Sequence, residues 1–297
     1  MQAAPARLGQ ASLLGRLLAC SLAWSTGFLF MKLAADVSPF VVSASRAGIA
    51  TLAIAGWMAL AGANPLPRRH EATPWLMLGT LNGWFPNVLT AWALGEITAA
   101  LGAMIQASGP IMVAVLAHLA FADERLTWRR TAGVLVGFAG MAVLVGPAVL
   151  QGGGGTWGVA AMIVVSFSYA VGNIYARTLR DMPASRMALG QQSVSALVSI
   201  LLSAVFVGTA AAPSMAANAP ALLALGIVST AIPITIFMTL IRRAGATRAA
   251  MIGYLLPVWA TLLAVIFLGE SVGWREGAGG AIILAGVWLV TAGPRGS

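Results

Sequence analysis

The chain has 297 residues, of which 59% are hydrophobic and only 8% are charged, and its formal net charge is +9. Soluble domains carry about 25% charged residues, so this composition excludes an ordinary soluble globule. The positive charge is also found in nucleic-acid-binding proteins. Here, however, the basic residues lie in short loops between apolar segments, where they set the orientation of membrane proteins. We therefore expect the lipid bilayer, and no nucleic acid, as a partner.

Apolar segments recur along the whole chain, and each is long enough to cross about 30 Å of hydrocarbon as a helix. Strand-like alternation is absent, which predicts an all-α membrane protein. The ten predicted spans cover residues 12–34, 40–62, 74–94, 99–121, 129–146, 156–179, 186–210, 219–242, 248–268 and 276–293. A run of four glycines at 152–155 predicts a linker between a first half, 1–150, and a second half, 151–297.

The distribution of basic residues gives the orientation of these spans. With the N-terminus inside, 14 of the 17 Lys and Arg residues fall in inner loops or at the termini. Only Lys32, Arg46 and Arg275 fall on the outer side. This asymmetry predicts that both termini are cytoplasmic.

The two halves have related patterns but opposite orientations. Prolines recur at a spacing of 147 residues, which pairs Pro86 with Pro233 and Pro110 with Pro257. Five spans are an odd number, so the second half enters the membrane in the opposite sense. The basic loop at 66–71 accordingly matches an uncharged loop around 211–219. The sequence therefore predicts two inverted-topology repeats of five helices, an architecture common among secondary transporters.

The paired prolines and the polar residues inside spans are the candidate functional residues. Proline breaks the hydrogen-bond ladder of a helix and frees carbonyls toward a cavity, so the four prolines are predicted helix breaks or gates; kinks that aid packing are the alternative. Polar and aromatic residues inside spans are predicted to line a substrate site between the repeats, with interhelical packing as the alternative for each. They are Trp24, Ser25, Asn82, Phe85, Gln106, Ser166, Tyr169, Asn173, Thr230 and Tyr254.

The sequence lacks the residues that several kinds of chemistry require. All eight acidic residues fall at span ends or in loops, which disfavours a central carboxylate relay for protons or cations. No cluster of metal ligands, no nucleophile paired with a base and no nucleotide motif is present. We therefore expect no metal, no cofactor and no enzymatic activity.

Motifs in both halves resemble a known family. Trp24, Lys32, Pro39 and Arg46 are similar to the opening of the EamA-type branch of the drug/metabolite transporter superfamily. In the second half, the segments Gly245-Ala246-Thr247-Arg248-Ala249, Tyr254-Leu255-Leu256-Pro257-Val258 and Leu268-Gly269-Glu270 resemble its signature, and Phe121-Ala122-Asp123-Glu124-Arg125-Leu126 is the first-half version.

The resemblance covers nearly the whole chain and implies a ten-helix carrier of the bacterial inner membrane. Such carriers work by alternating access and commonly export amino acids or related metabolites, so broad amino-acid export is the leading hypothesis. A drug or lipophilic-cation exporter with the same fold is the first alternative, and a membrane sensor or scaffold without transport is the second. The oligomeric state is left open, with a monomer as one of the states considered.

Overall fold

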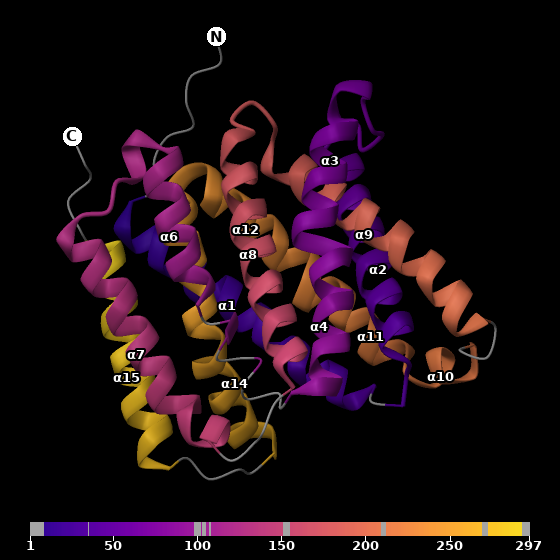
Figure 1. The fold of residues 1–297 in the computed structure, drawn as a ribbon. Helices are drawn as coiled ribbons and strands as arrows, with labels where there is room; N and C mark the ends of the chain where they lie inside the picture. Colours follow the sequence, from indigo (N-terminus) through magenta and orange to yellow (C-terminus); the bar gives the residue numbers. More distant parts are fainter. Residues whose placement is uncertain are drawn as a thin grey trace.

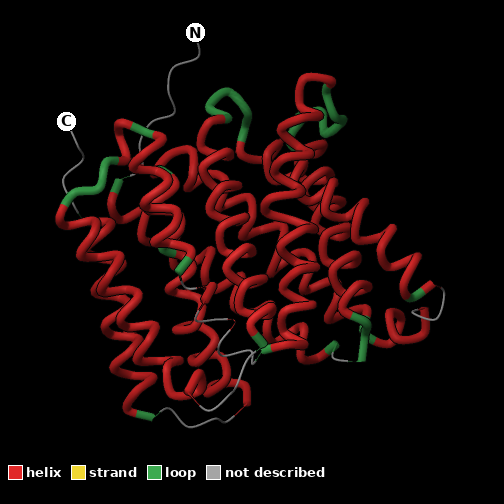
Figure 2. Tube along the Cα trace, in the orientation of Figure 1, coloured by secondary structure: helices red, strands yellow, loops and turns green. Residues whose placement is uncertain are grey.

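The computed structural model describes residues 9–34, 36–97, 102, 105–106, 108–150, 155–208, 212–268 and 273–292. Within these ranges every regular element is a helix and no strand occurs (Figure 2), which confirms the all-α class. Five helical segments among the described residues are long and apolar enough to cross a membrane: Gln10–Met31, Pro39–Leu60, Thr156–Thr178, Ala184–Phe206 and Ala219–Ala244. Shorter apolar helices are Gly109–Ala120 and Gly277–Thr291.

The helices follow the predicted spans closely. In chain order they are α1 (Gln10–Leu33), α2 (Pro39–Leu60), η1 (Arg69–Glu71), α3 (Ala72–Gly79), η2 (Thr80–Trp84), α4 (Phe85–Glu96), α6 (Gly109–Ala120), η3 (Ala122–Glu124), α7 (Trp128–Leu150), α8 (Thr156–Thr178), α9 (Ala184–Phe206), α10 (Ala212–Ala217), α11 (Ala219–Gly226), η5 (Ile227–Ala231), α12 (Ile232–Ala244), α13 (Ala246–Ala250), α14 (Ile252–Leu268) and α15 (Trp274–Thr291). The predicted span at 99–121 is represented mainly by α6, because most of residues 98–107 lie outside the described ranges.

The helices form one bundle in which elements from the two halves of the sequence pack against each other (Figure 1). Helix α1 lies against α12 and α14, α2 packs on α9, and α8 contacts both α4 and α6. Helix α1 begins and α15 ends at the same end of the bundle, drawn uppermost in Figure 1 and called here the upper end. The contacts of α1, α2 and α8 each join a helix of the first half to a helix of the second.

Glycines allow α7 and α15 to approach closely along one edge of the bundle (Figure 1). A Cβ atom added at Gly286 would lie 2.5 Å from the backbone nitrogen of Gly137 and 2.7 Å from the carbonyl oxygen of Gly133. A Cβ at Gly140 would lie 2.7 Å from the backbone nitrogen of Ile283. Backbone atoms cannot move aside easily, so this contact depends on small residues, as is common between membrane helices.

The glycine contact gives a stability prediction with a matched control in the same helix. Gly286→Ala is expected to lower the free energy of unfolding by about 1–3 kcal/mol, because the new methyl group overpacks the α7–α15 contact. Gly277→Ala has no atom within 4 Å of the added Cβ and should be neutral or slightly stabilising. Thermal unfolding of both variants in detergent measures the difference, and equal midpoints for the two variants would contradict it.

Candidate functional site

The segment from α3 to α4 is a broken helix in the middle of the bundle. Between the two helices lies the π-helical segment η2, in which Gly83 has the non-helical angles φ −122° and ψ −110°. Pro86 follows in the first turn of α4 and has no N–H to continue the ladder. Side chains from the second half bind the freed carbonyls: Ser168 Oγ donates to Leu81 O at 2.8 Å, and Gln191 Nε2 donates to Asn82 O at 3.2 Å.

Three amide side chains meet beside this break. Asn82 Nδ2 donates to Asn173 Oδ1 at 3.2 Å, which brings together two predicted site residues from opposite halves. Gln191 is the third, from α9. Asn82 Oδ1 and Gln191 Oε1 are buried and accept no hydrogen bond from any residue that the structure describes. Since buried polar atoms nearly always have partners, these two oxygens are candidate acceptors for a bound ligand.

The second half contains a matching π-helical segment, although no residue inside it has non-helical angles. The π-helical segment η5 starts at Ile227, which is 147 residues after Thr80, the start of η2. Pro233 follows in the first turn of α12, just as Pro86 follows η2. The spacing of the two π-helical segments equals the spacing of the prolines in the sequence.

The other two prolines lie in different surroundings. Pro110 is in the first turn of α6, after the turn residue Ser108. Helix α14 runs through Pro257 as one helix, and the chain is irregular earlier, at Met251 between α13 and α14. A single proline removes one hydrogen bond but need not end a long helix. Of the four predicted breaks, the one at Pro257 is thus displaced toward the start of its span.

Arg46 also contacts this region. The sequence analysis had assigned this residue to the outer side. It lies inside α2, and its Nε donates to Thr230 Oγ1 of η5 at 2.8 Å. Thr230 in turn donates to Leu225 O at 2.8 Å. The guanidinium is also near enough to Tyr169 of α8 for the two groups to interact electrostatically. Arg46 therefore reaches into the interface between the halves.

The charge of Arg46 has no acidic partner in the described part of the chain. The ion pairs found there involve Arg177 and Arg186, and none involves Arg46. Its terminal nitrogens donate to no residue that the structure describes, although the side chain is half-buried. An arginine inside an apolar bundle is costly and marks a functional site by default. The sequence carried this signal, because Arg46 falls inside the predicted span 40–62.

Further predicted residues extend this polar region. Tyr169 Oη donates to Asn87 Oδ1 at 3.2 Å, and Ser166 Oγ donates to Ile105 O at 3.3 Å. Ser25 Oγ donates to Leu256 O at 3.0 Å, the carbonyl that precedes Pro257. Each of these bonds joins elements from different spans.

The remaining predicted residues occupy different places. Trp24 packs on Phe237 with ring centroids 5.1 Å apart, and Phe85 packs edge-on against Trp84 at 5.9 Å. Gln106 is exposed. Tyr254 is fully buried and its hydroxyl donates to Val134 O of α7 at 3.2 Å, so it packs α14 against α7 and makes no contact with the amides.

Two buried carboxylates lie at the upper end of the bundle, and the sequence analysis had treated both only as residues at span ends or in loops. Glu71 forms an ion pair with Arg186 at the start of α9. Arg186 also donates to Asn64 O at 2.6 Å and to Leu66 O at 2.8 Å. This contact joins the first half of the chain to the second.

The second carboxylate is Glu124, which connects the two family-like motifs found in the sequence. It accepts hydrogen bonds from the backbone N–H groups of Ala246 at 2.7 Å and Thr247 at 2.8 Å. It also forms an ion pair with Arg177 at 3.3 Å. The turn depends on Gly245, which has φ 95° and lies against the carboxylate. The corresponding residue of the second half, Glu270, lies outside the described residues.

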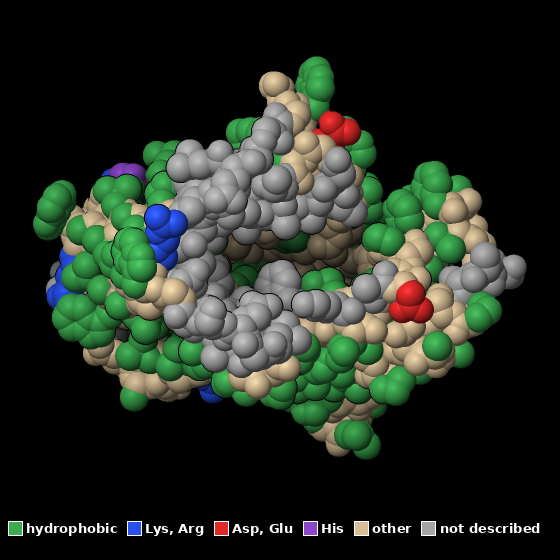
Figure 3. Space-filling model, turned by 90° about the horizontal axis from the view of Figure 1, so that it is seen from below, with side chains coloured by type: hydrophobic (Ala, Val, Ile, Leu, Met, Phe, Trp, Pro, Cys, Tyr) green, Lys and Arg blue, Asp and Glu red, His purple; other side chains and the backbone are tan. Residues whose placement is uncertain are grey.

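The opposite, lower end of the bundle contains a hollow (Figure 3). Seen from below, the described surface is hollowed between the helices (Figure 3). Among the described residues, no group of three His, Cys, Asp or Glu side chains could hold a metal ion.

Comparison with known structures shows the fold. A crystal structure of another protein superposes with a TM-score of 0.82 over 96% of this chain and 98% of that one, at 21% sequence identity. The curated relatives are also distant. A WAT1-related chloroplast protein of Arabidopsis thaliana is 26% identical over 90% of this chain, which spans 66% of that protein's length.

Bacterial relatives match over most of both lengths. The uncharacterized inner membrane transporter YedA of Escherichia coli K12 is 26% identical over 95% of this chain and 91% of its own length. A probable terminal-alkyne amino-acid exporter of Streptantibioticus cattleyicolor is 26% identical over 90% of this chain and 89% of its own. The model of the EamA-like transporter family matches residues 13–146 and 156–292. The chain therefore belongs to the EamA-like transporter family.

Proposed function

We propose that this chain exports amino acids and related small metabolites with broad specificity by alternating access. The substrate site lies between the halves, beside η2 and η5. Arg46 binds the substrate carboxylate, and the free oxygens of Asn82 and Gln191 accept hydrogen bonds from its ammonium group. Tyr169 and nearby aromatic residues contact the substrate side chain.

The observation that carries this proposal is the unpaired guanidinium of Arg46. Arginine presents a rigid fork of N–H groups that matches a carboxylate, and such charge-assisted bonds are the strong ones. Its Nε is held by Thr230 at 2.8 Å, which leaves the terminal nitrogens for a ligand. The amino-acid exporter among the relatives supports the same substrate class.

The same proposal includes the membrane topology. The chain crosses a bacterial inner membrane ten times as two inverted halves, 1–150 and 151–297, with both termini and the upper end in the cytoplasm. Support comes from the basic inner loops and from the separation of η2 and η5 along the chain, which equals the separation of Pro86 and Pro233. In this orientation the hollow at the lower end faces outward, while the ion pairs of Glu71 and Glu124 lie at the cytoplasmic side. Rocking of the halves would open the two sides in turn.

The alternative cargo is less well supported. A lipophilic cation would be repelled by Arg46, and no described carboxylate lies beside that residue to neutralise the repulsion. A sensor or scaffold without transport would need no such costly buried charge.

Flux measurements in proteoliposomes test the proposal. Radiolabelled aromatic, aliphatic and polar amino acids are presented with and without a pH gradient. We expect flux of several of them without a gradient, because no acidic residue lies in the middle of a span. Movement of a cationic dye without amino-acid flux would support the cation exporter instead, and no flux of any compound would support a non-transporting protein.

A further inference from the structure

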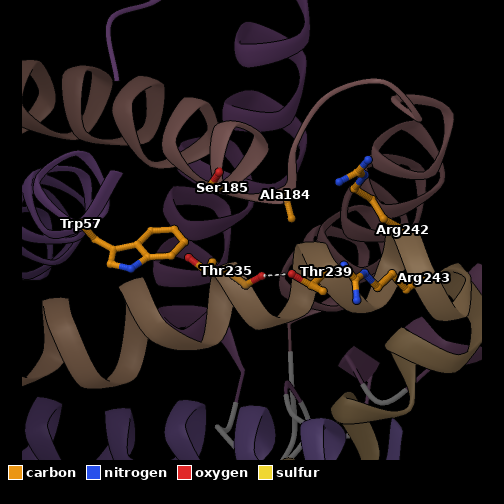
Figure 4. A pocket seen from close by; sticks show the side chains of 7 residues that line it. All are labelled: Trp57, Ala184, Ser185, Thr235, Thr239, Arg242 and Arg243. Carbon is orange, nitrogen blue, oxygen red and sulfur yellow. Dashed lines mark hydrogen bonds between the residues drawn. The ribbon is translucent and has the colours of Figure 1, made fainter. Parts of the chain in front are cut away.

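A cavity of about 190 Å³, whose lining does not include Arg46, lies toward the upper end of the bundle (Figure 4). It lies between the end of α2, the start of α9 and the last turns of α12. Its lining residues are Trp57, Ala184, Ser185, Thr235, Thr239, Arg242 and Arg243. In the close view, the indole of Trp57 lies at one side, the two arginines lie at the other, and the threonines lie between them.

The charge of this cavity is positive and is not neutralised by its lining. Arg242 and Arg243 are adjacent, and the lining contains no acidic residue. Arg242 Nη2 donates to Arg180 O at 2.9 Å, but its buried Nε donates to no residue that the structure describes. Asp181 is the acidic neighbour of Arg242, and the ion pairs of the described residues do not include it. The cavity therefore presents two guanidinium groups to an anion.

The two threonine hydroxyl groups of the cavity are arranged as acceptors. Thr235 Oγ1 donates its proton to Ala231 O at 2.8 Å, and Thr239 Oγ1 donates its proton to Thr235 O at 2.9 Å. Because both threonine hydrogens are already used, the lone pairs of the threonine oxygens remain for a donor group on the ligand. A ligand that complements this cavity carries an anion at one end and hydroxyl donors beside it.

The surroundings of the cavity face the membrane. Trp57 is 55% exposed, and Leu60, one turn further along α2, is 92% exposed. Tryptophan is enriched at the boundary between hydrocarbon and headgroups, where its ring is apolar and its N–H is polar. Exposed leucine on a helix of this apolar bundle is a contact for acyl chains. The cavity is therefore open to lipid at headgroup depth.

We propose that this cavity binds the headgroup of an anionic phospholipid. The arginines bind the phosphate, the threonine oxygens accept hydrogen bonds from hydroxyl groups of the headgroup, and Trp57 packs against the start of the acyl chains. Phosphatidylglycerol has this combination of groups. Free phosphate has the same anionic chemistry but no acyl chain to contact Trp57. The site is separate from the proposed transport site and does not depend on which substrate is carried.

Titrations of thermal stability test the proposal. The purified chain in a neutral detergent is titrated with short-chain phosphatidylglycerol, short-chain phosphatidylcholine or inorganic phosphate, and the apparent Kd is taken from the rise in Tm. We expect stabilisation by phosphatidylglycerol alone. One arginine near an anionic lipid contributes about fivefold in affinity, so Arg243→Gln should raise the Kd about fivefold and R242Q/R243Q about 30-fold.

The matched control is R68Q/R69Q, which removes an adjacent pair of exposed arginines at the same end of the bundle. Its Kd should equal that of the unaltered chain. The proposal is overturned if R242Q/R243Q keeps the affinity of this control. It is also overturned if phosphatidylcholine or inorganic phosphate stabilises the chain as strongly as phosphatidylglycerol. If R242Q/R243Q fails to fold, Arg243→Gln alone decides, because its exposed side chain can be replaced with little structural effect.

Discussion

Arg46→Gln is expected to reduce amino-acid transport by about 10- to 100-fold, because a hydrogen bond to a charged group contributes about 1.5–3 kcal/mol. Glutamine keeps a polar group of similar length near Thr230 but cannot pair with a carboxylate. Arg46→Lys keeps the charge and loses the fork of donors, so it should retain part of the activity. The loss should appear mainly as a raised KM, since the contact is already made in the bound substrate.

The control for this variant is Arg275→Gln. Arg275 is exposed at the start of α15, at the lower end of the bundle, and its guanidinium lies 5.4 Å from the ring of Trp274. Flux assays of both variants in proteoliposomes, at equal protein and equal Tm, separate a binding defect from misfolding. If Arg46→Gln transports amino acids as well as Arg275→Gln does, Arg46 does not bind the carboxylate.

Glu71→Gln is expected to lower the free energy of unfolding by about 3–5 kcal/mol, the usual cost of removing one partner from a buried ion pair. The side chains of Glu71 and Arg186 are only 3% and 5% exposed. The substitution leaves the Arg186 charge buried without its carboxylate, while Asn64 O and Leu66 O still accept from it. Thermal unfolding in detergent measures the loss. Asp181→Asn, at an exposed acid of the same end, is the control and should change little.

The same ion pair gives a pH dependence with a defined sign. Burial raises the pKa of the Glu71 carboxyl, but hydrogen bonds from Arg186 and from the Arg68 N–H, with the attraction of both charges, outweigh it and hold the pKa below its usual value. A carboxyl whose folded pKa is depressed stabilises the protein above its unfolded pKa, about 4.3. That stability is lost as the pH falls through the folded value. The difference in Tm between the unaltered chain and Glu71→Gln should therefore shrink below about pH 4, and a difference that grows on acidification would contradict this assignment.

The helical segments could be predicted from the sequence because their signals are local. Apolar length predicts helices, and the spacing between Pro86 and Pro233 matches the spacing between η2 and η5. The glycines that bring Gly286 against the α7 backbone are likewise visible as small residues in the sequence. Each of these features depends on residues a few positions apart or on a simple repeat.

The partners of the charged residues could not be predicted, because they come from distant parts of the chain. Glu124 is 122 residues from Ala246, and Glu71 is 115 residues from Arg186. Their loop positions suggested exposure, whereas the fold buries them. The hydrogen bond of Arg46 to Thr230, 184 residues away, likewise could not be predicted. Tyr254 is the opposite case. The sequence analysis placed it in the substrate site, but its hydroxyl donates to Val134 O within the contact between α14 and α7.

The central claim is that Arg46 binds the carboxylate group of the transported substrate. Counterflow tests it directly: proteoliposomes containing the unaltered chain and labelled phenylalanine are diluted into phenylalanine, 3-phenylpropionate or phenethylamine. The two carboxylates should accelerate efflux of the label, with phenylalanine the stronger because it also engages the amides, and phenethylamine should not. Acceleration by phenethylamine equal to that by phenylalanine, or none by 3-phenylpropionate, would contradict the account.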